Sequence, residues 1–251
     1  MRDNVRNREG LPMTGTPREL VGSKAAAWAV HGLTASGAAL AFLSLLALFD
    51  GDVRRAWIYL GVAFIVDGVD GALARRFAVK TALPRIEGAA LDLVVDYLTY
   101  VLVPVAFVYQ LGLLPEPLLL PGCLFILVTA LYTFANADLK TDDNYFTGFP
   151  ALWNVAVLHF YLLDLPLAVN AVATLVLGLM TFAPVKTLHP VRVRDWRWVT
   201  LTVLVVWSTA IAGLVWTHPD SPAGLEVIMV GGTAYFIGVS LWRTFERSRS
   251  T

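Results

Sequence analysis

The chain contains a succession of apolar segments, each close to the length that a helix needs to cross a lipid bilayer. A spanning helix requires about 20 predominantly apolar residues, and its own hydrogen bonds must satisfy its backbone because the hydrocarbon core holds no water. Such segments lie near residues 25–49, 56–78, 87–110, 117–137, 147–163, 165–185, 197–216 and 224–242. We therefore expect an all-α integral membrane protein with eight transmembrane helices. Only Asp164-Leu165-Pro166 separates the short fifth and sixth segments, so six and seven spans are the alternatives.

The composition excludes several other classes of protein. Hydrophobic residues make up 57% of the chain and charged residues 15%, well below the roughly 25% charged residues of soluble domains. The 19 basic and 19 acidic residues cancel, so no excess positive charge attracts nucleic acid, and we expect no nucleic-acid partner. Cys123 is the only cysteine, which excludes an intrachain disulfide and a cysteine-based zinc site.

Basic residues are distributed unevenly between the two sides of the expected topology. With eight spans both termini lie on one side, where 17 of the 19 Lys and Arg residues fall, against Arg54 and Arg55 on the other. Because cytoplasmic loops carry an excess of Lys and Arg, we expect a multi-pass protein of a bacterial-type inner membrane with both termini in the cytoplasm. Residues 1–24 contain five basic residues and no apolar core, so they predict a retained cytoplasmic arm and not a signal peptide.

Four acidic residues interrupt the second and third apolar segments. Asp67 and Asp70 are three residues apart, and Asp92 and Asp96 are four apart, so each pair occupies one face of its helix. Counted from the loop between the two helices, the four acids form two levels roughly 7 to 17 Å below the cytoplasmic helix ends. Charged residues inside a membrane helix are costly and by default mark a functional site.

Four carboxylates so close together predict a metal site. They cannot all stay ionised without cations, because mutual repulsion and desolvation both favour protonation. Hard divalent ions with oxygen ligands resolve this conflict, which favours Mg²⁺ or Mn²⁺, and the absence of nearby His and Cys argues against zinc or copper. The alternative is an acid cluster that shares protons or joins the two helices.

Small residues and an arginine follow the first pair of acids. Gly71 and Ala74 continue the stripe of Asp67 and Asp70, and Arg75 stands one turn nearer the cytoplasm. Small side chains leave room for a bulky ligand, and a guanidinium can fork onto a phosphate. Close helix packing is the alternative explanation for Gly71 and Ala74.

The complete pattern resembles the signature of the CDP-alcohol phosphatidyltransferase family, D-x2-D-G-x2-A-R followed by G-x3-D-x3-D. It is formed here by Asp67, Asp70, Gly71, Ala74, Arg75, Gly88, Asp92 and Asp96. The spacer between its two halves is longer than in many members. This spacer, with Thr34-Ala35-Ser36-Gly37 and other flanking motifs, resembles the branch that makes phosphatidylcholine, over roughly residues 29–160.

The resemblance implies transfer of a phosphatidyl group from CDP-diacylglycerol to an alcohol, with release of CMP and the use of two divalent cations, Mn²⁺ or Mg²⁺. It implies that Asp67, Asp70 and Asp92 ligate metal, and that Asp96 contacts metal and acts as the general base. It further implies a CDP-diacylglycerol site, whose expected residues are Asp67, Gly71, Ala74, Arg75, Gly88, His31 and Thr34. For His31, packing inside the bundle is the alternative.

The same resemblance implies a homodimer and a division of the chain into three parts. Residues 1–24 would be the arm, residues 25–185 the catalytic membrane core of about six helices, and residues 186–251 two additional helices with a short cytoplasmic tail. The active site would face the cytoplasm.

The expected acceptor is choline, a quaternary ammonium alcohol that aromatic faces bind well. The candidates are Tyr97, Tyr100, Tyr132 and Trp153, for each of which the interfacial aromatic belt is the alternative. Serine is the rival acceptor, although its carboxylate calls for a basic partner. A cation-coupled transporter would also carry intramembrane acids, yet all four acids fall within one helix pair and no second copy appears.

Overall fold

The computed structural model describes residues 23–136, 146–188 and 196–247, and every structural statement below concerns these ranges. The N-terminal arm expected at residues 1–24 and the last residues of the tail therefore lie almost wholly outside the described residues. The elements, in chain order, are α1 (Lys24–Phe49), α2 (Val53–Arg76), α3 (Val79–Ala82), α4 (Gly88–Tyr97), the π-helix η1 (Leu98–Leu102), α5 (Val103–Gln110), α6 (Glu116–Ala135), β1 (Phe146–Thr147), α7 (Trp153–Leu162), α8 (Leu167–Met180), β2 (Lys186–Thr187), α9 (Arg197–Thr217) and α10 (Ala223–Arg247).

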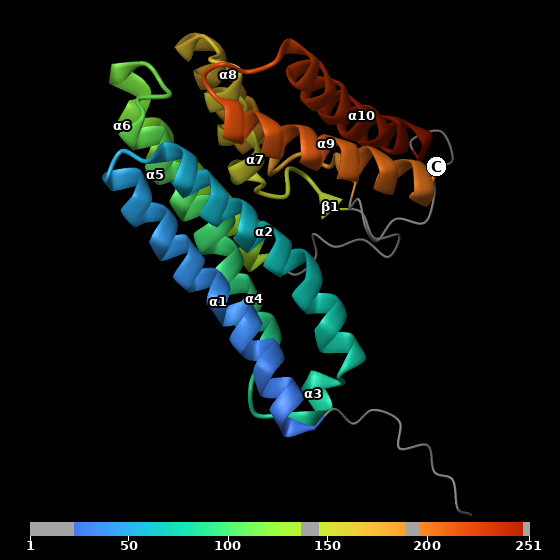
Figure 1. Cartoon of the computed structure of the whole chain (residues 1–251). Coiled ribbons are helices and arrows are strands. Elements are labelled where there is room, and N and C mark those ends of the chain that lie inside the picture. The colour runs from blue at the N-terminus through green and yellow to red at the C-terminus, as the bar shows by residue number, and fades with distance from the viewer. Residues whose placement is uncertain (1–22, 137–145, 189–195, 248–251) are drawn as a thin grey trace, which may run out of the picture.

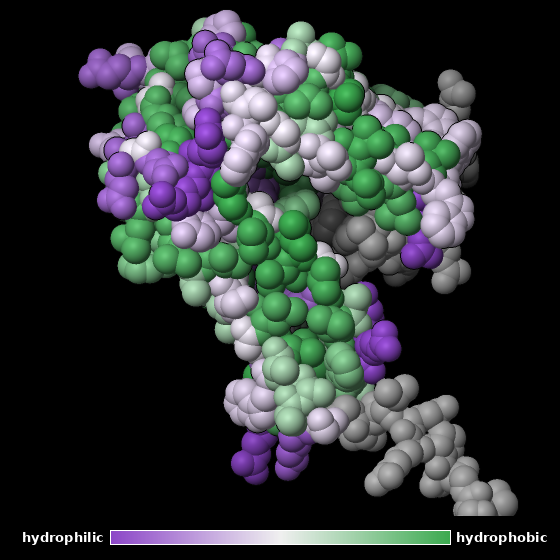
Figure 2. Space-filling model, in the orientation of Figure 1, coloured by the Kyte–Doolittle hydropathy of each residue, from purple (hydrophilic) through white to green (hydrophobic). Residues whose placement is uncertain are grey.

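The prediction of an all-α membrane protein is confirmed. Within the described ranges six helices are long and apolar enough to span a bilayer, with α4, η1 and α5 forming one of them from Gly88 to Gln110. The fifth and sixth expected spans contain the shorter helices α7, of 10 residues, and α8, of 14 residues. On the face that Figure 2 shows, hydrophobic residues cover much of the helix surface, and hydrophilic residues form separate groups. This distribution suits a chain whose solvent is lipid.

The ends expected for the fifth and sixth spans are wrong. Residues 147–152 and 181–187 are not helical; they lie side by side, and β1 and β2 form an antiparallel pair with Phe146 opposite Thr187. The Gly148 N–H donates to the Val185 carbonyl at 2.7 Å, and the Phe149 N–H donates to the Met180 carbonyl at 3.1 Å. These bonds take up backbone groups that a continuous helix would have used, so α7 starts late and α8 ends early.

Gly148 is the residue on which this pairing depends. Its φ of +82° is a conformation that residues with a Cβ rarely adopt, and an added Cβ would lie 2.5 Å from the Thr181 carbonyl oxygen. We therefore expect Gly148→Ala to reduce the free energy of unfolding by at least about 2 kcal/mol. The measurement is thermal unfolding of the purified protein in detergent. Gly61→Ala is the control, because a Cβ there meets no atom within 4 Å.

The four acids lie on α2 and α4, and α1 packs against both of these helices. Figure 1 shows α1, α2 and α4 running side by side toward the end of the molecule that bears α3. The Ser44 hydroxyl donates to the Ala56 carbonyl at 2.8 Å and so joins α1 to α2. Gly37 of α1 lies directly against Val95 of α4, where an added Cβ would meet Cγ1 at 2.5 Å. A side chain at Gly37 would therefore push α4 away from α1.

The long spacer between Arg75 and Gly88 of the signature contains the short helix α3. This helix begins after Ala78, which has a φ of +49°, and it buries Val79 and Ala82 against Ala27 and Val30 of α1. The loop is thus held over the first turns of α1. The sequence predicted a loop here and gave no indication of the helix, because four residues carry too little periodicity to identify one.

The last two helices form a hairpin that a polar cluster joins to the rest of the bundle. The Trp207 indole N–H of α9 donates to the Thr233 hydroxyl of α10 at 3.0 Å. The His159 Nε2 atom of α7 lies 2.8 Å from the same hydroxyl. Since buried polar groups in a bilayer need partners, this cluster fixes where the hairpin docks.

Candidate metal and diphosphate site

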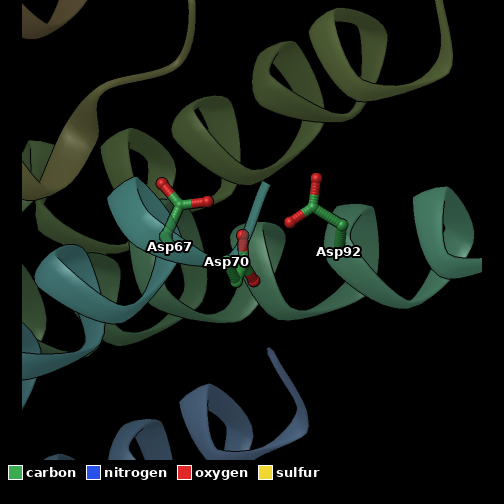
Figure 3. Close-up of side chains that lie close together, drawn as sticks. All are labelled: Asp67, Asp70 and Asp92. Atoms are coloured by element: carbon green, nitrogen blue, oxygen red, sulfur yellow. The ribbon is translucent and has the colours of Figure 1, made fainter. Parts of the chain in front are cut away.

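Three carboxylates from two helices converge on one point. Asp67 and Asp70 project from α2 and Asp92 from α4, and one oxygen of each lies within 4.8 Å of the others. Figure 3 shows the three side chains directed toward one another. Asp70 is buried, while Asp67 and Asp92 are half-buried. Asp67, Asp70 and Asp92 therefore lie close together, as their spacing and their depth in the two helices predicted.

The donor set fits a hard divalent ion. An ion with oxygen ligands at about 2.1 Å holds those ligands at most about 4.2 Å apart, so small rotations of the side chains bring all three oxygens to one ion. All three donors are carboxylates, which Mg²⁺ and Mn²⁺ prefer and which zinc and copper sites rarely use alone. Asp67, Asp70 and Asp92 are thus the residues that could hold a metal.

Asp96 adds a fourth carboxylate beside this group. It stands one helical turn beyond Asp92 on α4, is half-buried, and its carboxyl is in hydrogen-bond contact with that of Asp67. Asp67 is therefore a member of the group of three and also the contact between that group and Asp96. Asp96 is thus a fourth carboxylate next to the three oxygens that could hold an ion.

Two hydroxyl groups bond directly to the acids of α2. The Thr34 hydroxyl of α1 donates to Oδ2 of Asp70 at 2.6 Å. The Tyr100 hydroxyl of η1 donates to Oδ2 of Asp67 at 2.6 Å. Sequence reasoning assigned Thr34 to the nucleotide and Tyr100 to choline, and it missed both of these contacts. No local signal reveals them, because the partners are 36 and 33 residues apart in the chain.

The π-helix that carries Tyr100 has an identifiable cause. Proline lacks a backbone N–H, and its ring clashes with the carbonyl four residues earlier, which for Pro104 is that of Tyr100. The helix widens at this point, and the Val103 N–H donates to the Leu98 carbonyl, five residues back. Short π-helical turns occur frequently at functional sites. Pro104 was the signal in the sequence from which this irregularity could have been predicted.

The small residues of the signature are placed beside polar groups. An added Cβ at Gly71 would lie 3.6 Å from Nη1 of Arg75, so the guanidinium folds back over Gly71 toward the acids. At Gly88, the first residue of α4, an added Cβ would lie 2.9 Å from Cε1 of His31. Ala74 is half-buried beside α3, in a cluster with Val79. Gly71 and Gly88 therefore lie beside Arg75 and His31, whereas Ala74 packs in an apolar cluster.

His31 is a buried imidazole without a complete set of partners. It is 6% exposed, and its Nε2 atom has no hydrogen-bond partner among the described residues. An unsatisfied polar atom at this depth is unfavourable unless a ligand or water completes it. Thr34 lies one turn further along the same face of α1, so His31 and Thr34 border the acid cluster together.

The four aromatic candidates for choline do not gather at one place. Tyr100 bonds to Asp67, whereas Tyr97 donates its hydroxyl to the Leu127 carbonyl at 3.2 Å. The ring of Tyr132 lies 4.8 Å from that of Phe182, and Trp153 is fully buried in the hydrophobic core. Among the contacts of the described residues, only Tyr100 of these four bonds to one of the acids.

Comparisons with known proteins match the family that the pattern of acids resembles. A family model described as CDP-alcohol phosphatidyltransferase matches residues 30–189. A phosphatidylcholine synthase of Pseudomonas aeruginosa is 45% identical over 222 residues, which are 88% of this chain and 93% of that protein. A phosphatidylcholine synthase of Bradyrhizobium diazoefficiens is 41% identical over 227 residues, 88% of this chain and 80% of that protein. One of Legionella pneumophila is 34% identical over 228 residues, 88% of this chain and 89% of that protein.

Proposed function

Since this chain belongs to the CDP-alcohol phosphatidyltransferase family, we propose that it transfers the phosphatidyl group of CDP-diacylglycerol to choline and releases CMP. The observation that carries the proposal is the convergence of Asp67, Asp70 and Asp92, which brings the two halves of the signature to within 4.8 Å. A diphosphate carries concentrated negative charge, so it needs such a cation site to enter a bundle lined with carboxylates.

Asp67, Asp70 and Asp92 would hold divalent cations, which we propose to be two ions of Mn²⁺ or Mg²⁺. When bound, such ions neutralise the diphosphate and stabilise the attacking and leaving oxygens of an in-line displacement. The cluster lies within the membrane helices, where the lipid tails of CDP-diacylglycerol can remain in the bilayer while its headgroup reaches the acids.

We propose that Asp96 acts as the general base. Its carboxylate would take the proton of the choline hydroxyl as the choline oxygen bonds to the phosphorus that carries the diacylglycerol. The bond from that phosphorus to the bridging oxygen of the diphosphate breaks, and this oxygen leaves as part of CMP. The products are phosphatidylcholine, CMP and the proton on Asp96. The contact of Asp96 with Asp67 supports this role, because it keeps the proposed base next to the proposed metal site.

The CDP moiety would lie over the small residues of the signature. The backbone at Gly71 and Ala74 leaves room for it, and Arg75, folded over Gly71, can donate to a phosphate oxygen. Gly88 and Thr34 would border the same site from α4 and α1. His31, whose Nε2 atom is unsatisfied, would complete its hydrogen bonds with the ligand.

Choline is the acceptor that we propose, and the ring of Tyr100, whose hydroxyl contacts Asp67, is the candidate contact for its ammonium group. The other candidates, Tyr97, Tyr132 and Trp153, make their contacts elsewhere. The names of the relatives support choline, because proteins 45%, 41% and 34% identical to this chain are named phosphatidylcholine synthase. Serine is the alternative acceptor, and its carboxylate would need a basic partner near the acids.

The chain is a multi-pass inner-membrane protein, and we propose that its termini and its active site face the cytoplasm. The distribution of basic residues supports this orientation. We also propose that residues 25–185 form the catalytic core, which the family match to residues 30–189 supports, and that residues 186–251 form an appended helical pair with a tail. A homodimer is proposed from the family resemblance.

An acceptor panel tests the proposed function. We expect the purified protein with Mn²⁺ to release CMP from CDP-diacylglycerol at least about tenfold faster with choline than with serine, inositol phosphate or glycerol phosphate, since cation–π contacts favour a quaternary ammonium. The measurement is CMP formation by chromatography, with phosphatidylcholine identified by mass spectrometry. Turnover with one of the other alcohols and none with choline would refute the acceptor while leaving the family intact.

A further inference from the structure

We propose that the hydroxyl groups of Thr34 and Tyr100 are positioning groups for the metal site, each fixing one carboxylate of α2 in an orientation in which it can bind the ion. The proposal rests on the proposed function, because it assumes that Asp67 and Asp70 bind metal. It assigns to the Tyr100 hydroxyl a role other than contact with choline.

The hydrogen bonds themselves carry the argument. Thr34 and Tyr100 each donate to an Oδ2 atom at 2.6 Å, a short distance typical of a hydroxyl bound to a charged carboxylate. A carboxylate has two oxygens, each with two lone pairs, so Asp70 and Asp67 can still bind a cation while accepting these bonds, and Asp67 can do so beside its contact with Asp96. With one oxygen fixed, the rotation of each carboxylate is restricted before the ion arrives.

The two donors come from two different elements that contact α2. Thr34 belongs to α1 and is buried, and its hydroxyl also lies 3.3 Å from the Val30 carbonyl of its own helix. Tyr100 belongs to η1, and its ring lies 6.0 Å from that of Phe64, one turn before Asp67 on α2. Packing thus fixes each hydroxyl, and each α2 acid is held by a different neighbouring element.

The π-helix keeps Tyr100 in line with the acids of its own helix. Successive residues of an α-helix are rotated by roughly 100° about the helix axis. Between Asp92 and Tyr100 these rotations add up to two full turns and roughly 80° more, so in a regular α-helix Tyr100 would point roughly 80° away from the direction of Asp92. In a π-helical turn, where the hydrogen bond joins residues five apart, each residue is rotated by a smaller angle about the helix axis. The irregularity at Pro104 therefore reduces this difference in direction and directs Tyr100 toward Asp67.

Neutral donors suit this task better than basic residues would. A lysine or arginine on Asp67 would fix the carboxylate but would also cancel the charge that attracts the cation. A hydroxyl orients the carboxylate and leaves its negative charge in place. Hydrogen-bond partners of this kind, one step behind a metal ligand, typically change metal affinity or activity by about 10- to 100-fold when removed.

The test is Mn²⁺ binding to the full-length protein in nanodiscs without substrate, with free Mn²⁺ quantified by electron paramagnetic resonance. We expect Tyr100→Phe and Thr34→Val each to raise the dissociation constant by about 10- to 100-fold. Thr34→Ser, which keeps a hydroxyl, should stay within about threefold of the wild type. Raising Mn²⁺ should restore much of the CMP release of Tyr100→Phe, which a merely structural defect would not allow.

Thr99→Val is the matched control. Thr99 is a buried neighbour of Tyr100 in η1, but its hydroxyl donates to the Val95 carbonyl of its own helix at 3.1 Å. Dissociation constants of Tyr100→Phe and Thr34→Val close to that of the wild type would overturn the proposal, and so would an equal loss of affinity in Thr99→Val. A change in only one of the two variants overturns the assignment of the other residue. If the wild type binds Mn²⁺ but releases no CMP with choline, the proposed function fails while the positioning result still stands.

Discussion

Replacing Asp92 by Asn is expected to lower the rate of CMP release by about 10³-fold or more. Asp92 is the one residue of α4 among the three whose oxygens lie within 4.8 Å, so its loss leaves only the two acids of α2 to hold the ions. The amide keeps the shape of the side chain but removes its charge. Metal stabilisation of the transition state is worth several kcal/mol, and about 4 kcal/mol corresponds to about 10³-fold in rate.

The measurement for Asp92→Asn combines CMP release with Mn²⁺ titration. Asp164→Asn is the control, because Asp164 is an exposed residue in the turn between α7 and α8 and Asn tolerates its positive φ of +44°. The control should keep the wild-type rate and Mn²⁺ affinity. An Asp92→Asn variant that retains more than about a tenth of the wild-type rate at saturating Mn²⁺ would remove Asp92 from the metal site.

The membrane helices could be predicted because hydropathy is a local property of the chain. Each of the six long helices contains a segment that is apolar over about 20 residues, and a bilayer accepts little else. The meeting of the acids could be predicted for a similar reason. Two helices joined by one loop must run antiparallel, so residues at equal distances from that loop, such as Asp70 and Asp92, lie at similar depths.

The region around α7 and α8 could not be predicted from hydropathy. Phe146 and Thr187 pair across 41 positions of the sequence, and Gly148 contacts the backbone at the end of α8. Residues 147–152 are apolar on average, but Gly148 and Pro150 disfavour a helix there, and the pairing with residues 181–187 gives their backbone other partners. An apolar run therefore fixes membrane burial without fixing the helix boundaries.

The hydroxyl contacts of the acids were beyond sequence reasoning for another reason. Thr34 looks like any threonine in a membrane helix, where its hydroxyl commonly bonds to its own backbone. Tyr100 looks like a member of an aromatic belt. Only the packing of α1 and η1 against α2 brings the two hydroxyls onto Asp70 and Asp67.

Replacing Asp96 by Asn is expected to lower the rate of CMP release by about 10²- to 10⁴-fold while Mn²⁺ binding changes much less than in Asp92→Asn. The reason is positional. Asp96 lies beside the group of three oxygens and contacts it through Asp67, and an amide can still hydrogen-bond there. What the amide cannot do is accept the proton of the choline hydroxyl. Single-turnover CMP release and Mn²⁺ binding, measured on the same preparation, separate the two losses.

Raising the pH distinguishes a missing base from a damaged metal site. The fraction of choline present as alkoxide rises about tenfold per pH unit, so Asp96→Asn should recover activity relative to the wild type as the pH increases. Asp92→Asn lacks a metal ligand and not a proton acceptor, and its deficit should therefore stay constant. Unaltered CMP release in Asp96→Asn would exclude Asp96 as the base. A deficit in Asp96→Asn that ignores pH and follows Mn²⁺ concentration instead would assign Asp96 to the metal site alone.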